Sequence, residues 1–146
     1  MCTWSLSSRP AGYRSVVIFC MLLLYSVTVL ASGKDDYNKG VEFFKKGDYH
    51  AAIASFKSAE TKGMESAALY YNLGSSYNKI GNSAASKKYF TRVTDDPDQR
   101  ALAEFNLGMI ALTQDDTAQA LSHFQYAQAN SRNKKIVDAS TQSILG

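Results

Sequence analysis

Asparagine side chains recur at a fixed spacing along the chain, and an aromatic residue comes directly before each of them. The asparagines are Asn38, Asn72 and Asn106, and the residues before them are Tyr37, Tyr71 and Phe105. A side-chain amide both donates and accepts hydrogen bonds, so a row of amides can pair with the backbone of an extended peptide. Aromatic rings beside the amides would add buried contact at a small cost in entropy. The pattern is equally typical of a repeated scaffold, in which the same residues serve stacking.

Residues for catalysis or metal binding are missing from the sequence. The two histidines, His50 and His123, do not have a spacing that suits a shared metal ion, and the only cysteines are Cys2 and Cys20. There is no phosphate-binding glycine loop, no nucleophile elbow and no paired-histidine zinc motif. We therefore expect a protein that is not an enzyme and that has no catalytic residue, metal site or cofactor.

The charge of the chain argues against a nucleic-acid partner. The formal net charge is +3, and both Arg9 and Arg14 lie in the first segment of the 146 residues. The remaining lysines and arginines nearly balance the acids, and they form no clustered basic face of the kind that nucleic-acid binding needs.

Residues 1–31 have the parts of a secretory signal. Arg9 and Arg14 precede an apolar run over about 16–31, and Val29 and Ala31 fit the positions before a cleavage site. The run is short for a membrane-spanning helix, which needs about 20 apolar residues. We expect a cleaved signal peptide and an exported, periplasmic protein. The alternative is an uncleaved inner-membrane anchor with the rest of the chain facing the periplasm, which would be its only contact with the membrane.

Glycine and phenylalanine recur in one frame, at the same fixed spacing as the asparagines. The glycines are Gly40, Gly74 and Gly108, the phenylalanines are Phe56, Phe90 and Phe124, and small residues recur at Ala52, Ser86 and Ala120. This period predicts helix–turn–helix units stacked side by side. We expect helices over about 36–46, 50–61, 66–79, 83–94, 99–113 and 117–129. The glycine would let the two helices of a unit approach closely, and the phenylalanine would fill the gap to the next unit.

These positions resemble the signature of tetratricopeptide repeats (TPR) over residues 34–130. The match includes Leu73-Gly74, Leu107-Gly108 and the alanines and phenylalanines above, whereas Asp36, Tyr70 and Glu104 replace the signature tryptophan. The resemblance implies an all-α solenoid of three repeats, about 33–66, 67–100 and 101–134, after the N-terminal signal or anchor helix. We interpret residues 131–146 as a partial capping helix over the last apolar flank.

The sequence is also similar to the periplasmic TPR module that precedes an outer-membrane β-barrel in some Gram-negative proteins. The similar stretches are "ETKGMESAALYYNLGSSYNKIG" and "DDPDQRALAEFNLGMIALTQDD". This similarity implies an exported bacterial protein.

In the TPR frame, the first helix of each unit lines a concave groove. The resemblance implies a groove made of Tyr37, Asn38, Val41, Phe44, Tyr71, Asn72, Asn78, Lys79, Phe105, Asn106, Met109 and Leu112. Lys45 and Lys79 could meet an acid there, although a lysine on a helix is usually only solvated. TPR proteins that clamp a terminal carboxylate use Lys and Arg at positions that are held here by Tyr37, Val41, Leu102 and Asn106.

The function implied is a non-catalytic interaction module that binds another protein or an extended peptide. One alternative is a periplasmic accessory part of an outer-membrane transport, secretion or envelope assembly system, and another is an accessory subunit of an enzyme. The sequence leaves the partner and the oligomeric state open.

Overall fold

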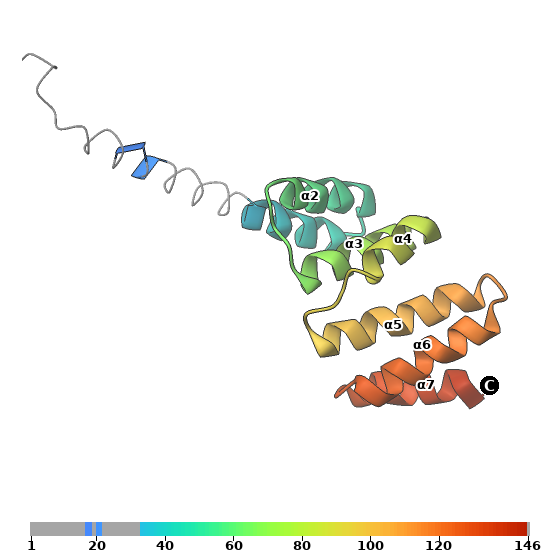
Figure 1. The fold of residues 1–146 in the computed structure, drawn as a ribbon. Coiled ribbons are helices and arrows are strands. Elements are labelled where there is room, and N and C mark those ends of the chain that lie inside the picture. The colour runs from blue at the N-terminus through green and yellow to red at the C-terminus, as the bar shows by residue number, and fades with distance from the viewer. Residues whose placement is uncertain (1–16, 19, 22–32, 146) are drawn as a thin grey trace, which may run out of the picture.

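The computed structural model describes residues 17–18, 20–21 and 33–145, and it is helical throughout these ranges apart from short turns (Figure 1). Residues 33–45 are helical, and they are followed by α2 (Tyr49–Thr61), α3 (Ala67–Lys79), α4 (Ser83–Phe90), α5 (Pro97–Leu112), α6 (Thr117–Asn130) and α7 (Lys134–Leu145). The described residues contain no strand, as expected for an all-α repeat protein. Most of the expected signal or anchor segment, and its cleavage site, lie outside them. Among the residues described, no helix is both long enough and apolar enough to cross a membrane.

The helices form pairs that stack into an array (Figure 1). Within the units, α3 pairs with α4 and α5 with α6, and between units α2 contacts α3, α4 contacts α5, and α6 contacts α7. The first helices also meet, because α3 contacts α5. The observed helices follow the expected ones closely, except that α4 ends at Phe90 instead of about Thr94. The backbone turns there and carries Val93 into the core, where it is buried.

The turn inside each unit reverses the chain at equivalent positions of the repeat frame. Gly47 and Gly81 have positive φ angles of 80° and 77°, and Asp115 takes the same place in the third unit with a φ of 58°. Glycine adopts this conformation without strain, and aspartate tolerates it better than most residues. The next residue, Asp48, Asn82 or Asp116, then caps the second helix by accepting a bond from its first turn.

Three glycine–phenylalanine contacts hold the helix pairs together. A Cβ atom added at Gly40, Gly74 or Gly108 would lie 2.5, 2.7 or 2.6 Å from the ring of Phe56, Phe90 or Phe124, respectively. Real Cβ atoms essentially never come so close, so each ring occupies the space that the glycine leaves empty. The close approach expected within each unit is therefore present in all three units.

The same three rings pack on the aromatic residues that come before the asparagines. Ring centroids lie 5.6 Å apart for Tyr37 and Phe56, 5.7 Å for Tyr71 and Phe90, and 5.5 Å for Phe105 and Phe124. Such tilted pairs are favourable beyond the area that they bury. We expected these phenylalanines to fill the gap to the next unit. Each ring also packs against the glycine and the aromatic residue of its own unit, so the expected role describes only part of its packing.

Helix α7 continues the frame of the first helices. It packs on α6 and contacts α5. Its residues Asp138, Ser140 and Gln142 come one full repeat after Glu104, Asn106 and Gly108. The position of the close-approach glycine therefore holds a glutamine in α7, which covers the flank of the third unit.

We expect Gly74→Ala to lower the free energy of unfolding by about 1–3 kcal/mol, because the new methyl group overpacks the ring of Phe90. Thermal unfolding followed by circular dichroism measures this. Gly33→Ala is the control, because a Cβ there would meet its neighbours at an ordinary 3.6 Å. Adding Phe90→Leu should relieve the clash, so the double variant should lose less than the sum of the single variants. Equal stability of Gly74→Ala and the unchanged protein would contradict this account of the glycine.

Candidate functional site

Helix α3 has one face that solvent reaches, and the expected groove residues lie along it. Ala68, Tyr71, Asn72, Ser75, Asn78 and Lys79 are partly or fully exposed and recur about one helical turn apart. Tyr77 is also partly exposed but lies off this stripe, where its ring stacks on Tyr89 of α4. Leu69, Leu73 and Ser76, which lie between the residues of the stripe, are completely buried. This pattern is one stripe along a helix, and its other sides are covered by neighbouring helices.

The equivalent residues of the two other first helices extend this stripe. On α5 they are Leu102, Phe105, Asn106, Met109, Leu112 and Thr113, and on residues 33–45 they are Lys34, Tyr37, Asn38, Val41, Phe44 and Lys45. Contacts between α3 and α5 and a hydrogen bond between Asn72 and Tyr37 bring the three stripes together. We call the combined area the first-helix surface.

The structure places the expected groove residues on this surface at two depths. Asn38, Asn78, Lys79, Met109 and Leu112 are exposed, whereas Tyr37, Val41, Phe44, Tyr71, Asn72, Phe105 and Asn106 are partly buried. The residues expected to be structural, Gly40, Ala52, Phe56, Gly74, Phe90, Gly108, Ala120 and Phe124, are all buried. The partly buried set can form the floor of a binding surface, and the exposed set can reach a partner.

Asn72 ties its unit to the preceding one, and Asn106 makes a longer contact of the same kind. Nδ2 of Asn72 donates to the hydroxyl of Tyr37 at 2.9 Å. Nδ2 of Asn106 donates to the carbonyl oxygen of Leu102 at 2.8 Å and lies 3.5 Å from the hydroxyl of Tyr71. The tyrosine hydroxyl of one unit therefore lies beside the asparagine amide of the next, and this contact gives the repeated Tyr and Asn positions a structural explanation.

The tyrosine hydroxyl in this pairing lies in a half-buried position. Burial raises the pKa of Tyr37, and the hydrogen bond from Asn72 opposes the rise only in part. Tyr37 therefore stays neutral near pH 7 and keeps its hydroxyl for the bond to Asn72. Asn38, the first copy of the amide, is exposed instead.

One repeat further along, both the tyrosine and the asparagine of this pair are replaced by other residues. Phe105 follows Tyr37 and Tyr71 in the frame, and it has no hydroxyl for an amide to bind. Ser140 follows Asn72 and Asn106, is completely buried, and its Oγ has no hydrogen-bond partner. The amide is thus absent where its tyrosine partner is absent, which supports a structural role for the Tyr–Asn pairs.

The residues at the position of the signature tryptophan are Asp36, Tyr70 and Glu104. Each makes a polar contact with a residue in the second part of its unit. Asp36 accepts hydrogen bonds from Ser58 and Lys62 at 2.6 Å each, and the bond from Lys62 lowers the pKa of Asp36. In the second unit, Arg92 donates to the hydroxyl of Tyr70 at 2.8 Å. In the third unit, Glu104 lies 2.7 Å from Nδ1 of His123.

A cluster of charged and aromatic residues between the first two units was not apparent from the sequence. Nζ of Lys57 lies 2.6 Å from the carboxylate of Glu60 and 2.9 Å from the hydroxyl of Tyr89. Arg92 also binds Glu60. Burial disfavours the charge of Glu60, but the bonds from Lys57 and Arg92 hold its pKa below the ordinary value. The cluster does not recur in the repeat frame, so no repeat signal could reveal it.

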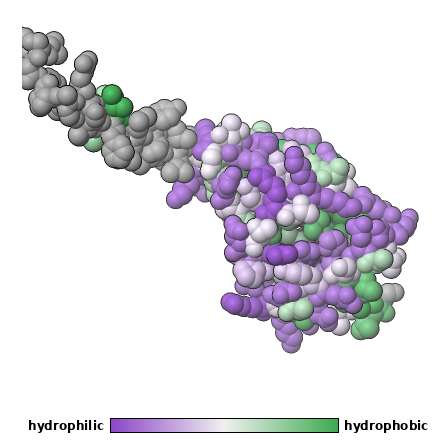
Figure 2. Space-filling view, in the orientation of Figure 1, coloured by the Kyte–Doolittle hydropathy of each residue, from purple (hydrophilic) through white to green (hydrophobic). Residues whose placement is uncertain are grey.

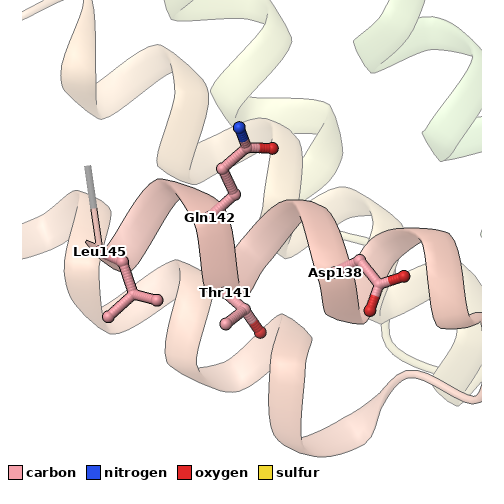
Figure 3. A pocket seen from close by; sticks show the side chains of 4 residues that line it. All are labelled: Asp138, Thr141, Gln142 and Leu145. Carbon is pink, nitrogen blue, oxygen red and sulfur yellow. The ribbon is translucent and has the colours of Figure 1, made fainter.

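The described residues offer no metal centre, since no group of three or more His, Cys, Asp or Glu side chains among them could hold an ion. A hollow of about 490 Å³ is lined by Asp138, Thr141, Gln142 and Leu145 (Figure 3). All four residues belong to α7, so the hollow is the open side of the last helix and not a cleft between elements. The molecular face in Figure 2 is mainly hydrophilic and is most apolar at the end of α7, where Leu145 is 81% exposed.

Residues 37–61 and 67–95 match the family model of the tetratricopeptide repeat. These two matches coincide with the first unit and with α3 and α4. No curated protein matches the sequence. The third unit lies outside the matched residues, but it has the same glycine–phenylalanine contact and the same aromatic pair as the other two.

We expect Asn72→Ala to lower the free energy of unfolding by about 1 kcal/mol, the usual net value of one hydrogen bond. The bond that it removes, to the hydroxyl of Tyr37, joins two units. Asn38→Ala is the matched control, because that amide is exposed. Its effect should stay within about 0.5 kcal/mol, as for most surface substitutions. Urea unfolding of both variants measures the difference.

A double-mutant cycle tests the pair itself. Tyr37→Phe should cost a similar amount and should couple to Asn72→Ala, because either change removes the same bond. Additive effects of the two substitutions would show that the pair carries no structural bond.

Proposed function

We propose that this tetratricopeptide repeat protein is a non-catalytic module that binds another protein, or a peptide segment of one, on its first-helix surface. Tetratricopeptide repeats generally mediate interactions between proteins, and the chain has two units that match the family model. The observation that carries the proposal is the exposure of apolar side chains on α5. Met109 and Leu112 are 42% and 39% exposed, one turn apart on the first-helix surface.

Physical chemistry supports these two side chains as anchors. Exposed single apolar residues are common on proteins, but here a half-buried aromatic floor continues beside the pair. Burying the exposed part of each side chain would contribute about 1 kcal/mol to binding. Asn78 and Lys79 on the neighbouring α3, and Asn38 on residues 33–45, are exposed and add polar groups to the same surface that can bond to a partner. An apolar centre with a polar rim is the usual arrangement of a protein interface.

We expect Leu112→Ser to release a partner that the unchanged protein retains from periplasmic extract. The matched control is Leu121→Ser on α6, because Leu121 is 40% exposed but does not belong to the first-helix surface. Quantitative mass spectrometry of the retained proteins should show a loss of at least about fivefold for Leu112→Ser. Circular dichroism should show that both variants stay folded. Equal retention by the two variants would contradict binding on the first-helix surface.

We also propose that the protein acts in the periplasm. The support is the positive, apolar and small-residue pattern of residues 1–31, together with the similarity to exported bacterial TPR modules. The alternative is a chain that keeps this segment as an inner-membrane anchor and presents the repeats to the same compartment. Either form would present the first-helix surface to periplasmic or outer-membrane proteins, in keeping with an accessory role in envelope transport or assembly.

Expression of the full chain in a Gram-negative host tests the location. We expect the periplasmic fraction to contain a chain that begins at Ser32, since Val29 and Ala31 fit the cleavage signal. Intact mass spectrometry of the fractions measures it. A full-length chain in the membrane fraction would favour the anchor, and a full-length chain in the cytoplasm would contradict export.

A further inference from the structure

The charges on the first-helix surface have one sign. Its charged residues are Lys34, Lys45 and Lys79, and all three are exposed. The equivalent positions of the three helices include no aspartate or glutamate. The chain as a whole is close to balanced in charge, with 16 Lys and Arg against 13 Asp and Glu. The surface is therefore more basic than the composition of the chain.

Many of the acids are occupied elsewhere in the fold. Asp48, Asp96 and Asp116 cap helices with their side chains. Asp36 and Glu60 form ion pairs with Lys62 and Arg92, and Glu104 lies 2.7 Å from Nδ1 of His123. These pairs lie between first and second helices, or between units, and thus away from the surface stripe. Asp35 and Glu42 are exposed on residues 33–45, but each lies one position from the stripe.

The lysines lie near the apolar anchors along the array. Lys45 and Lys79 occupy the same position of successive first helices, directly after Phe44 and Asn78, and Leu112 holds the position of Phe44 in the third unit. Two cations and the exposed apolar side chain are thus at the same end of neighbouring helices. A partner that spans this end would meet positive charge on the first two units and apolar surface on the third.

We propose that the partner segment is acidic and carries apolar side chains, so that its carboxylates face Lys45 and Lys79 while an apolar residue contacts Met109 and Leu112. The inference rests on the proposed function and adds the chemistry of the partner. It concerns carboxylates along a segment and not a terminal carboxylate, because the first-helix positions held by Tyr37, Val41, Leu102 and Asn106 carry no cation.

A competing explanation for Lys79 comes from its place in α3. It lies in the last turn, where a cation is stabilised by the helix dipole. That role would account for a lysine without any ligand. The two explanations differ in their effect on binding, because a purely helical role predicts that the sign of the charges on a bound peptide does not matter.

The test uses the full chain in a mild non-ionic detergent and a set of fluorescein-labelled peptides. The peptides share their leucines and their length, and their remaining positions hold Glu, Gln or Lys. Fluorescence anisotropy measures the affinity at low and at physiological salt. We expect the Glu peptide to bind about fivefold or more tightly than the Gln peptide, and the Lys peptide to bind most weakly. The preference should weaken as salt screens the charges.

Matched charge reversals locate the effect. Lys79→Glu should remove most of the preference for the Glu peptide, whereas Lys88→Glu, an exposed lysine on α4, should change its affinity less than about twofold. Both variants change the net charge equally, so a difference between them comes from position. Circular dichroism checks that Lys79→Glu stays folded, and Lys45→Glu provides a second reversal outside the last turn of α3.

The outcomes separate this inference from the function on which it rests. Equal binding of the Glu and Gln peptides, weakened in both cases by Leu112→Ser, would overturn the acidic preference and leave the binding surface in place. Equal effects of Lys79→Glu and Lys88→Glu would also overturn it. Binding that no first-helix variant changes would overturn the proposed function itself.

Discussion

The array depends on the close approach of one glycine and one phenylalanine in each unit. The ring of Phe56, Phe90 or Phe124 lies where a Cβ atom would be, so the two helices of the unit cannot separate without opening a void. The same ring supports the half-buried aromatic residue of the first helix, at centroid distances of 5.5–5.7 Å. This residue in turn forms the floor of the first-helix surface. One contact inside the core therefore fixes the depth and spacing of the surface that a partner would meet.

The asparagine pattern shows why repeated chemistry in a solenoid is ambiguous in the sequence. A solenoid repeats a residue when every unit needs it, either for packing inside the array or for binding at its surface. Asn72 donates to Tyr37 of the preceding unit, and Asn106 bonds to Leu102 of its own helix and lies 3.5 Å from Tyr71 of the preceding unit, whereas Asn38 is exposed. The replacement of a tyrosine by Phe105, and of the following amide by Ser140, ties the two positions together. The amide pattern is thus largely part of the scaffold, and the side chains proposed to contact a partner, Met109 and Leu112, do not repeat.

The sequence predicted the fold better than the site, for a physical reason. Helix bounds, close-approach glycines and the all-helical architecture follow from local propensity and the repeat period, and both are visible in one chain. Helix α4 ends early because the backbone turns to bury Val93, which local pattern does not reveal. The cluster of Lys57, Glu60, Tyr89 and Arg92 depends on side chains from separate helices and occurs once. Contacts that occur once, between residues far apart in the sequence, produce no repeated pattern from which they could be predicted.

The three units share the residues of the close helix contact but differ at the end of the first helix. The close-approach glycine and the phenylalanine are the same in each unit, whereas the positions at the end of the first helix change from Phe44 to Asn78 to Leu112 and from Lys45 to Lys79 to Thr113. Stacking does not require these differences, since each unit makes the same glycine–phenylalanine contact without them. A surface that needed only solubility would favour polar residues at all three positions, yet α5 exposes Met109 and Leu112. If the protein binds a segment as proposed, the change along the array, from lysines on the first two units to apolar side chains on the third, would favour one register of that segment, which identical units would not.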